Sequence, residues 1–76
     1  MNKIYVVSFE GNRFSTCVSG VYGAFTSYEK AYKSLQDMLN RQHTKIQDIE
    51  TCTNTYRFYV YDGVYEIDRI VIDQEI

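Results

Sequence analysis

One stretch of the chain has the periodicity of a long helix, and it constrains the fold more than any other feature. Its apolar residues recur at intervals of three and four, which places them on one helix face. They are Tyr28, Ala31, Tyr32, Leu35, Met38 and Leu39. The charged residues Lys30, Lys33, Asp37 and Arg41 follow a different row, which we expect to face solvent. A lone amphipathic helix must bury its apolar stripe against a second layer, and the rest of the chain has to provide that layer.

The residues around the start of this helix contain a capping pattern. Thr26 is the predicted N-cap, because its hydroxyl can accept a hydrogen bond from a backbone N–H of the first turn. Glu29 lies three residues further on and can reach back to the N–H of the cap, which completes a capping box. At the other end, the weak helix formers Asn40 and His43 predict that the helix ends near Gln42.

The residues before the helix predict a hairpin. Residues 3–9 are mostly β-branched or aromatic, which is typical of a strand in the interior of a sheet. Residues 10–13 predict a turn, and residues 14–18 predict the returning strand. We expect residues 19–20 to break that strand and residues 21–25 to form a short extended lead into the helix.

A second hairpin is predicted after the helix. Asp62 and Gly63 separate two strand-like runs, residues 56–61 and 64–72. Asp-Gly between such runs is a strong hairpin signal, because both residues tolerate the positive φ of a type I′ turn. The residues expected on the core side of this hairpin are Tyr56, Phe58, Val60, Tyr65 and Ile67.

The predicted register of this hairpin has one irregular point. A two-residue loop sets Tyr61 opposite Val64 and Arg57 opposite Asp68, so that opposite charges pair. Past Asp68 the pattern changes phase, because Ile70 and Ile72 fall on the same face as Asp68. A bulge at residues 68–69 would return both isoleucines to the core; without the bulge, they would face a second chain.

Together these elements predict an α+β fold in a single domain, residues 1–76. One antiparallel sheet of about four strands, in ββαββ order, is packed on one face by one α-helix. The pattern of residues 43–55 fits either a helical turn or an irregular strand, and we treat this segment as a connection.

Charge is distributed unevenly along the chain. The formal net charge is −2, but residues 1–47 contain six basic and three acidic residues, a net of +3. Residues 48–76 contain two basic and seven acidic residues, a net of −5. An acidic C-terminal hairpin favours partners with a basic surface, although uneven charge is also common in small domains.

No catalytic or metal-binding constellation is present in the sequence pattern. Cys17, His43 and Cys52 lack the close spacing of a zinc site. His43 and Cys52 flank Asp48 and Glu50, but residues of these types are too common for a Cys–His nucleophile to be inferred. We therefore expect a non-enzymatic protein with no metal and no cofactor.

The expected setting of the chain is the cytoplasm. No apolar run approaches the roughly 20 residues needed to span a membrane, and no signal peptide is recognisable. Both cysteines are therefore expected as free thiols, although they could form one bridge. Direct nucleic-acid binding is disfavoured, because the tyrosine-rich hairpin is also the acidic one and would repel phosphate.

The expected binding surface is the C-terminal hairpin. Tyrosine is a favoured interface anchor, since it combines a large contact area with a polar tip. The candidate partner-binding residues are Tyr59, Tyr61, Asp62, Val64, Glu66 and Asp68. Three alternatives stay open: a cross-strand tyrosine ladder within one monomer, a homodimeric regulatory or ligand-sensing domain, and a weak single-stranded nucleic-acid binder.

The chain resembles a group of very small domains encoded by phages and their bacterial hosts. The resemblance lies in a first strand at residues 4–7, the motif Gly23-x-Phe25-Thr26-Ser27-x-Glu29-x-Ala31, and a final strand ending in Ile72-Asp73. The theme of the group is a strand, a helix that starts with aromatic-Ser-x-Glu-x-Ala, and a closing strand. The Asp-Gly hairpin departs from this theme, because simpler members have a single strand there.

In size, acidity and lack of catalytic residues the chain is also similar to phage proteins that disable host defences, anti-CRISPR proteins included. This similarity implies a phage-encoded inhibitor that acts by stoichiometric binding in the cytoplasm of the host cell. The expected target is a host defence protein or nucleic-acid-handling protein with a basic surface.

Overall fold

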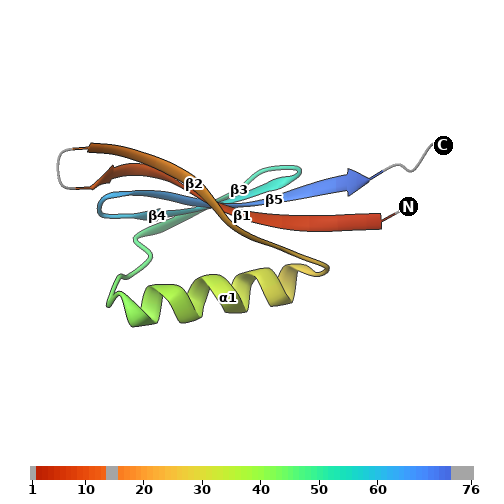
Figure 1. The fold of residues 1–76 in the computed structure, drawn as a ribbon, viewed down its shortest axis with the longest axis horizontal. Helices are drawn as coiled ribbons and strands as arrows, with labels where there is room; N and C mark the ends of the chain where they lie inside the picture. The colour runs from red at the N-terminus through yellow and green to blue at the C-terminus, as the bar shows by residue number, and fades with distance from the viewer. Residues whose placement is uncertain (1, 14–15, 73–76) are drawn as a thin grey trace.

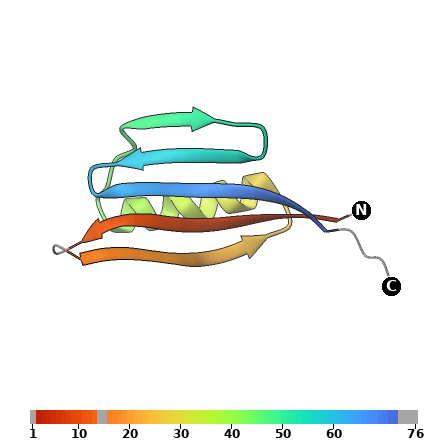
Figure 2. The same ribbon diagram turned by 90° about the horizontal axis from the view of Figure 1, so that it is seen from above.

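The chain folds into one helix packed on one antiparallel sheet, as the sequence predicts. A computed structural model describes residues 2–13 and 16–72, with the side chains of residues 3–11 and 19–72. Two strands, β1 (Asn2–Arg13) and β2 (Thr16–Phe25), precede helix α1 (Tyr28–Arg41). Three strands follow it: β3 (Asp48–Thr51), β4 (Thr55–Val60) and β5 (Gly63–Ile72). Their order in the sheet is β2-β1-β5-β4-β3, and every neighbouring pair is antiparallel (Figure 2).

The strands before the helix are longer than predicted. β1 continues to Arg13, so there is no turn at residues 10–13, and β2 passes through residues 19–20 without a break. Pairing explains both differences: Gly11 lies opposite Val18 and Gly20 lies opposite Phe9, so each glycine is held inside the β1–β2 ladder. Residues 14 and 15, where the returning strand was predicted to begin, lie outside the described residues, as does Asp73.

A fifth strand replaces part of the predicted connection at residues 43–55. β3 pairs with β4, which makes the element order ββαβββ. All four residues of β3 are exposed. The strand therefore lacks the alternation of buried apolar and exposed polar residues by which a strand is recognised in a sequence. No helix in the part of the chain that the structure describes is both long and apolar enough to cross a membrane.

The core lies between α1 and one face of the sheet (Figure 1). The helix contributes three fully buried residues, Ala31, Leu35 and Leu39, from the predicted stripe. The sheet contributes Val7, Phe9, Phe58, Val60, Tyr65 and Ile67. The predicted core side of the C-terminal hairpin is therefore confirmed.

Tyrosine rings close the side of this core. Tyr28 at the start of α1 stacks on Tyr32, with ring centroids 5.8 Å apart, and packs 4.5 Å from the ring of Tyr56 on β4. Tyr5 on β1 meets Tyr28 edge-to-face. These half-buried rings fill the space where the narrow helix cannot cover the sheet.

The N-terminus of α1 differs from the prediction, whereas its C-terminus agrees with it. Ser27, not Thr26, is the N-cap, and its hydroxyl accepts a hydrogen bond from the Lys30 N–H at 3.3 Å. The predicted capping box does not form, because shifting the cap by one residue puts Lys30 instead of Glu29 at the third helical position. The helix ends at Arg41, in agreement with the predicted end near Gln42.

His43 closes the C-terminus of α1 in the left-handed region. Its φ is 54°, the only positive φ of the described residues. The His43 N–H donates to the Asn40 carbonyl at 3.2 Å, and the Thr44 N–H donates to the Leu39 carbonyl at 2.9 Å. These two bonds form a Schellman motif, in which glycine is the usual residue at the position of His43.

The register of the β4–β5 hairpin differs from the prediction by two positions. Val60 pairs with Gly63 and Tyr59 pairs with Val64, so the two-residue loop is Tyr61-Asp62. Neither loop residue has a positive φ, which excludes the predicted type I′ turn. The shift is even, so the side chains of the paired strands stay on their predicted faces, while Tyr61 moves from the predicted strand into the turn.

Gly63 is needed inside the ladder and not in the turn. It pairs across β1 with Gly11, and the two backbones approach over the ring of Phe9. A Cβ on Gly63 would lie 2.5 Å from the Glu10 carbonyl oxygen, and a Cβ on Gly11 would overlap the Asp62 carbonyl oxygen. The glycine pair therefore fixes the turn one residue earlier than the Asp-Gly signal indicates.

Of the two alternatives for residues 68–69, the bulge is absent. β5 pairs with β1 in one unbroken register from Gly63 to Ile72. Ile70 and Ile72 therefore stay on the face away from α1, where their exposed fractions are 45% and 37%.

The glycine pair gives a first prediction. We expect Gly11→Ala to lower the free energy of unfolding by about 1–3 kcal/mol, because the added methyl meets backbone that cannot move aside. Gly20→Ala is the matched control, since a Cβ there meets nothing within 4 Å. The control should be neutral or slightly stabilising in urea denaturation. Equal losses for both variants would contradict the close-approach argument.

The helix C-terminus gives a second prediction. We expect His43→Gly to raise the free energy of unfolding by about 0.5–1 kcal/mol, because glycine adopts positive φ without strain. His43→Ala keeps the strain and should show no such gain. Thermal and urea denaturation of the two variants measure the difference, and a loss of stability in His43→Gly would contradict the assignment.

Candidate functional site

The sheet face away from α1, here called the open face, contains the predicted binding residues. Strand alternation and the registers place side chains from all five strands on it. Tyr59, Val64, Glu66 and Asp68 lie together on this face, on the paired strands β4 and β5. Tyr61 and Asp62 form the turn at the end of the same hairpin, with Tyr61 76% exposed. The structure thus brings the predicted residues onto one continuous surface.

Three further residues of this surface come from strands that the sequence reasoning did not connect to the hairpin. Glu10 lies on β1 opposite Val64, while Asp48 and Glu50 lie on β3 opposite Tyr59 and Arg57. The open face therefore has an acidic zone made of Glu10, Asp48, Glu50, Glu66 and Asp68. One feature of the sequence could have indicated β3. Asp48 and Glu50 are two residues apart, as are Arg57 and Tyr59, so in an antiparallel strand pair each carboxylate can lie opposite a hydrogen-bond donor.

Arg57 is the only basic residue among the described side chains of the open face, and two carboxylates hold it. Its Nε donates to Glu66 Oε2 and its Nη1 donates to Glu50 Oε1, both at 2.8 Å. Nη1 also lies 3.6 Å from the sulfur of Cys52, an exposed free thiol. The predicted pairing of Arg57 with Asp68 is wrong, because the register shift sets Arg57 opposite Glu66.

Hydrogen bonds extend this network across the hairpin. The Tyr59 hydroxyl donates to Glu50 Oε1 at 3.1 Å, and the Thr55 hydroxyl donates to Asp68 Oδ1 at 2.7 Å. The hydrogen bond from Arg57, followed by that from Tyr59, lowers the pKa of the Glu50 carboxyl below its ordinary value. The same carboxylate raises the pKa of the Tyr59 hydroxyl. Tyr59 is therefore held by a hydrogen bond and is not simply one half of a tyrosine ladder.

The acidic zone covers only part of the open face. Toward the start of β1 and the end of β5, the face is apolar: Ile4 lies opposite Ile70, and Val6 lies between Ala24 and Asp68. The opposite side of the molecule is only slightly positive, since Lys30, Lys33 and Arg41 are exposed on α1 together with Glu29 and Asp37. The excess of negative charge therefore lies on the open face, while the charges on α1 nearly balance.

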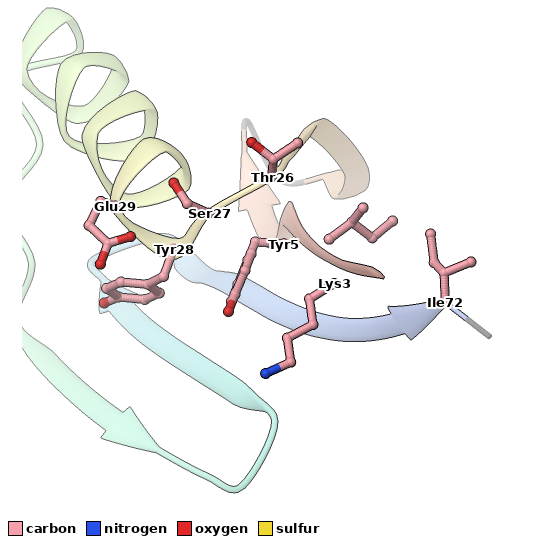
Figure 3. A pocket seen from close by; sticks show the side chains of 8 residues that line it. Lys3, Tyr5, Thr26, Ser27, Tyr28, Glu29 and Ile72 are labelled. Atoms are coloured by element: carbon pink, nitrogen blue, oxygen red, sulfur yellow. The ribbon is translucent and has the colours of Figure 1, made fainter. Parts of the chain in front are cut away.

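A hollow of about 700 Å³ lies beside the N-terminus of α1 (Figure 3). Lys3 and Tyr5 from β1, with Tyr28 and Glu29 from α1, are among the residues that line it. The Ser27 hydroxyl in this hollow already accepts the Lys30 N–H. The hollow brings one cation and one carboxylate to its rim, and so has no net charge for an ionic ligand to recognise.

The side chain of Cys17 lies outside the described residues. In the described part of the chain, no three histidine, cysteine or acidic side chains are grouped so that they could hold a metal ion.

Comparison with models of known protein families, with curated proteins and with solved structures finds no match to this chain.

The Glu50 network gives a third prediction. Because the folded state holds the Glu50 pKa below its ordinary value, its contribution to stability is present above the ordinary pKa and is lost as pH falls through the folded pKa. Arg57→Gln should move the Glu50 pKa up toward the ordinary value, and Tyr59→Phe should move it less. Carboxyl-detected NMR titration measures both shifts. An unchanged Glu50 titration in Arg57→Gln would contradict the network.

Proposed function

We propose that the chain is a non-enzymatic protein-binding module whose open face binds a partner with a basic surface. The observation that supports this most is the acidic zone, where five carboxylates share one face with a single guanidinium, Arg57, which Glu50 and Glu66 already bind. Such a surface attracts cations over a distance of about one Debye length and repels other acidic proteins.

The target class that fits this chemistry is a protein with a basic groove for nucleic acid. Carboxylates spread over neighbouring strands could occupy the positions that phosphates take in such a groove. Tyr59 and Tyr61 add ring surface at the edge of the acidic zone. Together with the resemblance in size and charge to phage anti-defence proteins, this supports an inhibitor that binds a host defence or nucleic-acid-handling protein stoichiometrically.

Single-stranded nucleic acid is a poorer fit to the same face. Stacking on Tyr59 would bring phosphates toward Glu50 and Asp48. Among the described side chains of this face, the one basic residue is Arg57, and it is already paired. A second candidate function, a homodimeric regulatory domain, is favoured by the exposed Ile70 and Ile72. The two candidates differ in salt dependence, because binding between charged surfaces weakens with salt and apolar association does not.

A fourth prediction tests the acidic zone with a matched pair of variants. Glu10→Lys/Asp48→Lys reverses two exposed charges of the open face outside the Arg57 ion pairs, while Glu29→Lys/Asp37→Lys makes the same net change on α1. The tagged chain is used to capture proteins from bacterial lysate at rising salt. We expect the open-face variant to weaken capture about tenfold and the helix variant to leave it nearly unchanged.

The captured protein must also meet the chemical description. Elution by a DNA oligonucleotide and by salt, with one captured protein per chain, would support the proposed target class. Equal capture by both double variants, or capture that resists both salt and DNA, would overturn the role of the acidic zone.

A further inference from the structure

The two edges of the sheet are protected to very different degrees. The β3 edge is four residues long and includes two carboxylates, Asp48 and Glu50. The β2 edge is ten residues long, and its sequence, TCVSGVYGAF, has no charged residue and no proline. Short length, charge, proline and β-bulges are the usual means of preventing edge-to-edge pairing, and of these β2 has only an irregularity at Tyr22. The fold therefore protects the β3 edge and leaves the β2 edge able to pair.

The exposed side chains of β2 are suited to a further strand. Among the described residues, β2 has a neighbouring strand only on the β1 side, so alternate backbone groups point outward along its free edge. Val21 on the open face is 70% exposed. Tyr22, at the irregularity of the β1–β2 register, packs 6.0 Å from the ring of Tyr65 yet stays 47% exposed. Both residue types favour cross-strand contacts.

Charge decides which mode of self-association the fold permits. Stacking two open faces would place five carboxylates against five identical ones, which like-charge repulsion opposes. Joining two helix faces would bring Lys30, Lys33 and Arg41 of each copy together, with only Glu29 and Asp37 to offset them. The β2 strand has no charged residue, so pairing with itself puts no charge on the pairing line, and the cations nearest to it line a hollow beside its last residue, Phe25. The strand also has no charge with which to select an acidic or a basic peptide.

We propose that β2 pairs antiparallel with β2 of a second copy of this chain. The same strand forms the contact in both copies, which are related by a twofold axis. Each β2 edge is then paired with the other, so no third copy can add there and the assembly closes as a dimer. The two sheets become one continuous sheet with both helices on the same side. The acidic zones then lie on one shared surface of twice the area, independent of whether that surface binds the partner proposed above.

A fifth prediction tests this dimer on the purified full chain. Light scattering coupled to gel filtration should show the mass rising from 9.0 kDa toward about 18 kDa as concentration increases. Val21→Lys should hold the mass at that of the monomer, because it places a cation from each copy beside the pairing line. Ile49→Lys is the matched control, since Ile49 is 53% exposed on the other edge strand, and it should dimerise normally.

Hydrogen exchange keeps the test decisive should Val21→Lys fail to fold. In the unmodified chain, alternate β2 amides should become protected as concentration rises, while the β3 amides should not change. A monomer at every concentration, or dimers that survive Val21→Lys but not Ile49→Lys, would overturn the proposal. Loss of dimer in Val21→Lys alone, with concentration-dependent protection in β2, would establish it.

Discussion

The fold depends on how much sheet one helix can cover. α1 has 14 residues and is about 21 Å long, whereas β1 has 12 residues and extends about 40 Å. Leu35 and Leu39 can therefore bury one face of the sheet over roughly half its length, and the described chain supplies no second layer. The open face, and the exposure of Ile70 and Ile72 on it, follow from the lack of a second layer in the described chain, and Figure 1 shows the helix on one side of the sheet only.

Tyrosine allows a small chain to complete such a limited core. Tyr65 is fully buried, and Tyr5, Tyr28, Tyr32 and Tyr56 pack against the core while remaining partly exposed. A phenol ring suits this position, because its body is apolar and its hydroxyl can still reach a polar partner or water. Tyr59 and Tyr61 lie elsewhere, on the open face and its turn. The high tyrosine content therefore reflects two separate needs, closing the core and forming a surface.

Much of the fold could be predicted from the sequence wherever local periodicity sets it. The Ala31, Leu35 and Leu39 stripe predicts the helix, and alternation predicts which face each hairpin residue occupies. The hairpin register could not be predicted, because Gly63 is a turn signal locally and meets Gly11 only through β1. Likewise three of the five carboxylates of the acidic zone come from β1 and β3, and these strands pair with the hairpin through contacts that no turn in the sequence announces. What local pattern cannot encode is which strands become neighbours.

The separation of charge in this fold gives the molecule a permanent electric dipole directed through the sheet. Its negative end is the open face, with five carboxylates and one guanidinium, and its other end is α1, where Lys30, Lys33 and Arg41 slightly outnumber Glu29 and Asp37. In the field of a charged surface such a dipole experiences a torque before any contact is made. The chain would therefore rotate its acidic side toward a cationic body during approach, so that a larger fraction of collisions begin in a productive orientation.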